Sequence, residues 1–230
     1  MKMYAGLALA LFLGACGSDA TAPAVPAASA AADGPAAELP VMGPERRILA
    51  LGDSLFAGYG LSPGEGYPER LEAALRARGI NARITNAGVS GDTTAGGRQR
   101  LGFVLGSMNP APEVAVISLG GNDMLRGLPP EETRVNLDAI LAELKAKGIQ
   151  PVLLGMLAAP NMGAEYAGKF NPVYPALAKK HGAILVPFFL QPLIDKPQLI
   201  QQDRIHPTAQ GIELLVDDTI DEVAGALPKA

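Results

Sequence analysis

From residue 46 onward, short apolar runs alternate with longer amphipathic stretches, and this alternation restricts the fold more than any other feature of the sequence. Strands are predicted at residues 48–51, 83–86, 114–119, 152–157 and 183–188, and helices at 67–78, 133–147 and 208–227. Strands and helices that alternate in this way form a parallel sheet with helices on both faces. The loops that follow the strands should meet at one edge of the sheet, where binding and catalysis collect.

Four polar segments follow predicted strands or precede the last predicted helix. They are Gly52-Asp53-Ser54-Leu55, residues 86–93 (NAGVSGDT), residues 120–123 (GGND) and residues 203–207 (DRIHP). In this order they resemble the sequence blocks of the SGNH (GDSL) hydrolases, in particular the bacterial branch of arylesterases, acyl-CoA thioesterases and lysophospholipases. The resemblance covers essentially the whole folded part, and it implies a three-layer α/β/α sandwich with a flavodoxin-like parallel sheet.

The residues of these segments suit nucleophilic catalysis. A serine hydroxyl such as that of Ser54 needs a neighbouring base to take its proton. The chain has two histidines. His181 lies where a predicted helix ends and is expected to be a solvated cap residue, so His206 is the predicted base. Asp203 would accept the other ring N–H and hold the tautomer. Without Ser54 upstream, Asp203 and His206 would indicate only a capped surface turn.

The resemblance also implies an oxyanion hole with three donors, which are the backbone N–H groups of Ser54 and Gly91 and the side-chain amide of Asn122. Donors of this kind stabilise the negative charge that develops on the substrate carbonyl oxygen. Gly91 would equally suit a simple turn, and Asn122 an Asx-turn. Asp53 and Asp123 are predicted to brace these loops as hydrogen-bond acceptors.

Three segments nearly match other known motifs, and each differs from its motif at a residue that the motif requires. Residues 163–169 fit most of a phosphate-binding loop, but Phe170 stands where a Ser or Thr hydroxyl is needed. Residues 58–60 follow a strand like a dinucleotide fingerprint, but Pro63 replaces the third glycine. Phe56 removes the Gly-x-Ser-x-Gly elbow. No His, Cys and carboxylate cluster has zinc spacing, so neither a metal nor a cofactor is expected.

The resemblance implies a serine esterase for short- to medium-chain acyl or aryl esters, and also for thioesters and lysophospholipids. A carbohydrate O-deacetylase with the same triad and a non-catalytic binding lipoprotein are the alternatives. Residues 120–130 and 157–170 are predicted apolar walls for the acyl chain, although their Met and Leu residues would also suit the core. The net charge of −4 and the absence of a basic block argue against a nucleic-acid partner.

The amino-terminal part indicates export. Residues 1–15 are predicted to be a lipoprotein signal peptide, and the segment that ends at Cys16, the chain's only cysteine, resembles a lipobox. Residues 16–45, rich in Ala and Pro, are expected to tether the hydrolase domain of residues 46–230 to a lipid on Cys16. Gly17 favours the outer membrane, facing the periplasm, over the inner membrane. A soluble periplasmic protein is the alternative, and a monomer is expected.

Overall fold

The strands form one parallel sheet in the order β2-β1-β3-β4-β5. The structure is a computed structural model that describes residues 41–229, so Cys16, the predicted signal peptide and most of the predicted tether lie outside the described residues. The strands are β1 (Arg46–Gly52), β2 (Ala82–Gly88), β3 (Val114–Ser118), β4 (Gln150–Leu154) and β5 (Ile184–Val186). This is the flavodoxin-like order, so the predicted sheet is confirmed.

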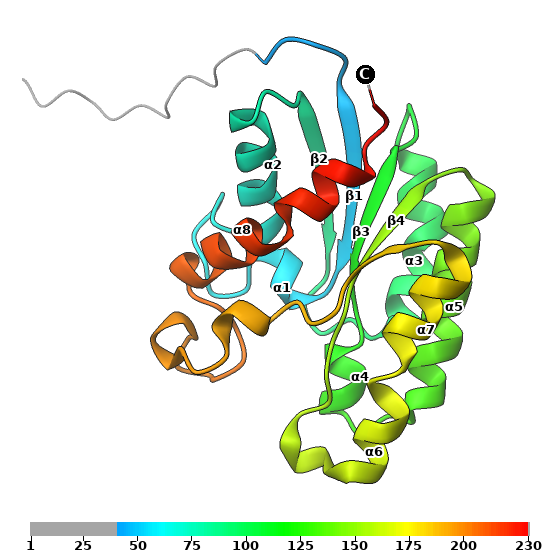
Figure 1. Ribbon diagram of the computed structural model, residues 1–230, viewed down its shortest axis with the longest axis vertical. Coiled ribbons are helices and arrows are strands. Elements are labelled where there is room, and N and C mark those ends of the chain that lie inside the picture. The colour runs from blue at the N-terminus through cyan, green and yellow to red at the C-terminus, as the bar shows by residue number, and fades with distance from the viewer. Residues whose placement is uncertain (1–40, 230) are drawn as a thin grey trace, which may run out of the picture. The chain divides into compact units, whose positions relative to one another are not determined.

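Helices cover both faces of the sheet (Figure 1). They are α1 (Ser54–Ala57), α2 (Tyr67–Ala77), α3 (Thr94–Ser107), α4 (Gly121–Leu125), α5 (Pro130–Ala146), α6 (Gly163–Phe170), α7 (Val173–His181) and α8 (Ala209–Ala226). Helices α2 and α8 lie together on one face, and α3, α5 and α7 pack side by side on the other. Within residues 41–229, no helix is long and apolar enough to cross a membrane.

The core lies on both faces of the central strands. In β1 the last five residues, from Ile48, are buried, and β3 is buried along its whole length. Strand β2 is an edge strand with mixed polar and apolar residues, and the sequence predicts a weaker strand at residues 83–86. It is longer than predicted, because its backbone pairs with β1 from Ala82 to Gly88 whatever its side chains are.

The sequence does not predict helix α3, and for α7 it predicts only the end at His181. Helix α3 buries residues such as Leu101 and Leu105, but its Phe103 is 82% exposed and it contains several glycines, which disfavour helices. Strand β4 ends at Leu154, three residues before its predicted end at residue 157. The chain beyond Leu154 is loop, which leaves Met156 and Leu157 free to line a cavity.

Candidate active site

Ser54 is held at the point where β1 ends and α1 begins. Asp53 caps α1, because its Oδ1 accepts a hydrogen bond of 3.1 Å from the backbone N–H of Leu55. Gly88, at the end of β2, lets α1 lie close to the β2 backbone, because a Cβ on Gly88 would come within 2.4 Å of the Ala57 nitrogen. Ser54 is therefore the first residue of α1, at the carboxyl edge of the sheet (Figure 1).

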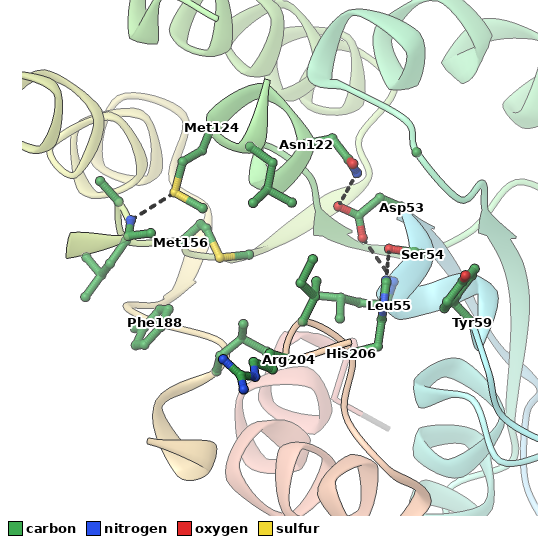
Figure 2. A pocket seen from close by; sticks show the side chains of 18 of the residues that line it. Asp53, Ser54, Leu55, Tyr59, Asn122, Met124, Met156, Phe188, Arg204 and His206 are labelled. Carbon is green, nitrogen blue, oxygen red and sulfur yellow. Dashed lines mark hydrogen bonds between the residues drawn. The ribbon is translucent and has the colours of Figure 1, made fainter. Parts of the chain in front are cut away.

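The structure brings Ser54, His206 and Asp203 into one hydrogen-bonded chain. Figure 2 shows Ser54 and His206 side by side at the cavity. The Ser54 Oγ lies 2.8 Å from the His206 Nε2, and the His206 Nδ1 lies 2.6 Å from the Asp203 Oδ2. Asp203, as a carboxylate, accepts the N–H at Nδ1, which leaves the lone pair of Nε2 directed at the serine hydroxyl. This is the order of groups in which an imidazole withdraws the proton of a serine.

Asp203 is fixed by its own loop. Its Oδ1 accepts hydrogen bonds from the backbone N–H groups of Ile205, at 2.9 Å, and His206, at 3.0 Å. The hydrogen bond from the His206 ring, followed by those two backbone bonds, lowers the pKa of Asp203 to about 2. The carboxylate is therefore ionised at neutral pH and can stabilise an imidazolium.

Two residues that the sequence did not single out hold the His206 loop against the α1 region. The ring of Tyr59 lies beside the His206 ring, with 4.4 Å between centroids. The Gln201 Nε2 donates hydrogen bonds of 2.8 Å to the carbonyls of Tyr59 and Pro207. Tyr59 lay in the rejected dinucleotide motif, and no local pattern marks Gln201. These contacts limit the movement of the imidazole relative to Ser54.

Gly91 and Asn122, the other two predicted oxyanion-hole residues, line the same cavity as Ser54. Gly91 has φ of +83°, which favours glycine, and its carbonyl accepts a hydrogen bond of 2.6 Å from the Nη2 of Arg126. Asn122 lies in the first turn of α4, and its Nδ2 donates to the Asp53 Oδ2 at 3.3 Å. Helix α4 and the residue after it thus hold Gly91 and Asn122 in place.

Asp53 and Asp123 act as the predicted loop-bracing acceptors. Asp123 is buried and accepts hydrogen bonds from the backbone N–H of Thr94, at 2.8 Å, and from the hydroxyls of Thr94 and Thr133. It thereby joins α4 to the starts of α3 and α5. Asp53 performs the same task between α1 and Asn122.

The carboxyl of Asp53 is buried, with 3% of its surface exposed. Burial raises the pKa of Asp53 to about 6, opposed by the Leu55 backbone hydrogen bond and by the charge of His206. Asp53 is therefore ionised at neutral pH, where it accepts the Asn122 amide and faces the base. A buried charge of this kind lowers stability, and functional sites commonly carry that penalty.

The raised pKa of Asp53 predicts how stability depends on pH. Between about pH 4 and pH 6 native Asp53 keeps a proton that the unfolded chain has lost, so its contribution to stability declines as pH rises. Asp53→Asn removes this decline. We expect the free energy of unfolding of the variant, relative to the parent, to increase by on the order of 3 kcal/mol from pH 4 to pH 7. Urea unfolding across that range measures it, and a constant difference would contradict it.

A cavity of about 800 Å³ opens beside Ser54 (Figure 2). Its walls come from α4, the loop after β4, the loop after β5 and the His206 loop. Most of the lining side chains are apolar, and they are Leu55, Met124, Leu125, Met156, Leu157, Ala158, Ala159, Pro160, Phe188, Leu190, Ile194 and Ile205. A space of this size and polarity suits an acyl chain or an aromatic ring.

The predicted cavity wall at residues 157–170 is correct only for its first four residues. Residues 157–160 line the cavity, whereas the rest of the segment forms a 3₁₀ turn and α6 and does not reach it. Phe170 is instead buried in the core, where its ring packs between Tyr166 and Tyr174. In the other predicted wall, Met124 and Leu125 line the cavity.

His181, predicted as a solvated cap, is instead buried, although it does end α7 as expected. The ring is buried because α7 packs against α5. This packing brings His181 to Asp138, with 2.6 Å between Nε2 and Oδ1. His181 has a structural partner and stands apart from Ser54. In residues 41–229, no group of three or more His, Cys, Asp or Glu side chains is placed to hold a metal ion.

A flavodoxin-like sheet with a Ser54–His206–Asp203 chain at its carboxyl edge defines a serine hydrolase. The model of the GDSL-like Lipase/Acylhydrolase family matches residues 50–214. The chain belongs to this family.

Curated relatives and solved structures agree with this assignment. Esterase TesA of Pseudomonas aeruginosa is 40% identical over 160 residues, 70% of this chain and 79% of the relative. Thioesterase 1/protease 1/lysophospholipase L1 of Escherichia coli is 36% identical over 170 residues, 74% of this chain and 79% of the relative. The crystal structure of AlinE4, an SGNH-hydrolase family esterase, matches with 60% identity and a TM-score of 0.69, covering 82% of this chain and all of that one.

Two further structures of AlinE4 are of variants, one with a serine and one with an aspartate replaced by alanine. The two replaced positions are 149 residues apart.

Proposed function

We propose that the protein is a serine esterase that hydrolyses carboxylic esters with short- to medium-chain acyl or aryl groups through an acyl-enzyme on Ser54. The observation that carries the proposal is the contact of 2.8 Å between the Ser54 Oγ and the His206 Nε2, with Asp203 on the other ring nitrogen. Ser54 and Asp203 are also 149 residues apart, the separation of the two positions replaced in AlinE4.

The reaction proceeds in two steps. In the first, His206 takes the proton of Ser54 while the Oγ attacks the carbonyl carbon of the ester, and the same proton then passes to the departing alcohol. The acyl group remains on Ser54. In the second step His206 takes a proton from water, the hydroxide attacks the acyl carbon, and the proton returns to Ser54 as the acid leaves.

The carbonyl oxygen becomes negative in both steps, and we assign its stabilisation to the backbone N–H groups of Ser54 and Gly91 and the amide of Asn122. All three residues line the cavity. Removing one such donor typically lowers the rate by roughly 10²- to 10³-fold. The Arg126 and Asp53 contacts hold Gly91 and Asn122 in place before the substrate arrives.

The apolar walls of the cavity favour hydrocarbon acyl groups. The names of the relatives include an esterase and a thioesterase/lysophospholipase, so thioesters and lysophospholipids are included among the proposed substrates. A sugar acetate would leave its hydroxyl groups unpaired against Met and Leu side chains, which argues against the carbohydrate O-deacetylase alternative. The complete Ser54–His206–Asp203 chain argues against a non-catalytic binding role.

The proposed activity is tested with a series of p-nitrophenyl esters, from acetate to dodecanoate, and residues 41–230. We expect kcat/KM to rise with acyl length while added methylenes are buried against apolar walls, and to fall once the chain is longer than the cavity. The sugar ester 6-O-acetylglucose, which keeps its other hydroxyl groups free, should react slowly. Inertness toward all p-nitrophenyl esters would contradict the proposal, as would a preference for the sugar acetate.

The cellular location remains a proposal that rests on the sequence. Cys16 and the apolar segment before it favour a lipid anchor in the bacterial cell envelope, at the outer membrane and facing the periplasm. The anchor would place the hydrolase near lysophospholipids and imported esters. We further propose that the enzyme acts as a monomer.

A further inference from the structure

Arg204 lies in an unusual backbone conformation beside the catalytic residues. Its φ is +62°, and Asp195 is the other non-glycine residue in 41–229 with a positive φ. The bend at Arg204 allows the Asp203 Oδ1 to meet the N–H groups of Ile205 and His206. Glycine would satisfy this bend with less strain. The turn therefore gives no reason for an arginine at this position, and the reason must lie in its side chain.

The Arg204 side chain lines the catalytic cavity and is exposed. Figure 2 shows it on the wall formed by the His206 loop, across the cavity from Asn122. No hydrogen bond or ion pair joins its guanidinium to another side chain in the described part of the protein. The nearest carboxylate in sequence, Asp203, already accepts from the His206 ring and from two backbone N–H groups. Arg204 is thus a free cation on a largely apolar wall.

An unpaired guanidinium in this position is suited to bind an anion. Its fork of N–H donors matches the oxygens of a carboxylate or a phosphate, and it keeps its charge at every physiological pH. Apolar residues such as Phe188 and Ile205 line the same cavity and can hold the acyl chain while the guanidinium binds the anion. The opposite charge in the cavity, Asp53, is already engaged by Leu55 and Asn122.

We propose that Arg204 determines specificity by binding an anionic oxygen group of the substrate, so that the preferred esters carry a carboxylate or a phosphate as well as an apolar acyl chain. This inference rests on the proposed esterase function. Arg204 holds the anion in the bound state and in the transition state alike, so its contribution is expected in KM more than in kcat. Arg204 takes no part in the bond changes at Ser54.

The test compares charged and neutral esters of matched acyl length. One arm uses mono-p-nitrophenyl glutarate against p-nitrophenyl valerate, and the other uses lysophosphatidylglycerol against a monoacylglycerol with the same acyl chain. The variants are Arg204→Gln, which removes the charge, Arg204→Lys, which retains it, and Arg204→Gly, which suits the backbone. Lys196→Gln, an exposed cation outside the cavity lining, is the control.

We expect the parent to prefer the anionic ester in at least one arm, and Arg204→Gln and Arg204→Gly to lower kcat/KM for that ester by about five- to twenty-fold, mostly through KM. Neutral esters should change less than about two-fold in the same variants, Arg204→Lys should recover part of the preference, and salt should weaken it. A response in the glutarate arm identifies a carboxylate as the ligand, and one in the lysolipid arm identifies a phosphate.

An unchanged ratio of anionic to neutral rates in Arg204→Gln and Arg204→Gly, in both arms, would overturn the inference. So would an equal loss on both kinds of ester, which would indicate a structural role. Hydrolysis of p-nitrophenyl valerate by the parent keeps the esterase proposal intact in these cases. An inert parent enzyme would refute the esterase proposal itself, and the inference with it.

Discussion

Ser54→Ala is expected to lower kcat/KM for p-nitrophenyl esters by roughly 10⁴- to 10⁶-fold, with little change in stability. The substitution removes the Oγ that lies 2.8 Å from the His206 Nε2, so no acyl-enzyme can form. The remaining activity would come from water attack assisted by the other site residues. The side chain is small and half-buried, so its loss leaves little cavity.

Ser90→Ala is the matched control, because Ser90 lines the same cavity while the His206 Nε2 is bonded to Ser54. We expect it to retain activity within a few-fold. A fluorophosphonate probe gives an independent measurement, since it should add one covalent group to the parent and to Ser90→Ala but none to Ser54→Ala. Labelling of Ser54→Ala, or an activity above one hundredth of the parent's, would assign the nucleophile to another residue.

His206→Gln should also lower kcat/KM by at least about 10⁴-fold, because the amide cannot take the proton of Ser54 at neutral pH. The loss should appear in kcat, since the apolar cavity that binds the acyl chain remains. The Asp203 carboxylate would lose the hydrogen bond that lowers its pKa most, so the pKa of Asp203 should rise from about 2 toward its ordinary value. A steady-state assay over the ester series measures the first effect.

His181→Gln is the control for the loss of a histidine. His181 is buried against Asp138 at the end of α7, away from the serine. We expect this variant to keep kcat/KM within about three-fold and to lose about 1 to 2 kcal/mol of stability in urea unfolding. If His181→Gln were as inactive as His206→Gln, the assignment of the base would be wrong.

The local sequence predicts most of the sheet and the three residues that the structure joins in the Ser54–His206–Asp203 chain. Strands β1 and β3 are continuous apolar runs because both of their faces are buried, and such runs are visible without a structure. The segments of Ser54, Gly91 and Asn122 follow strands that end at one edge of the sheet, so the topology alone brings them together. Helix α3 is not predicted because its glycines and its exposed Phe103 weaken the amphipathic pattern of the sequence.

Local sequence patterns do not predict which of residues 157–170 line the cavity. Residues 157–170 have an apolar composition that suits a cavity wall and a core equally well. Only the positions of α5, α6 and α7 decide that Phe170 is buried in the core while Leu157 lines the cavity. His181 was misassigned for the same reason, because the partner that accepts it, Asp138, lies 43 positions away on another helix.

The sequence by itself determined the class of fold, because strand periodicity is a property of neighbouring residues, and the order of the strands through the family resemblance. Its motifs predict Ser54, Asp203 and His206 as the catalytic residues. The tertiary structure alone decided which distant loops meet. It placed Gln201 on the Tyr59 carbonyl, Arg126 on the Gly91 carbonyl and Arg204 on the cavity wall. These contacts depend on backbone dihedral angles and helix packing across the sheet edge, which no local pattern of residues specifies.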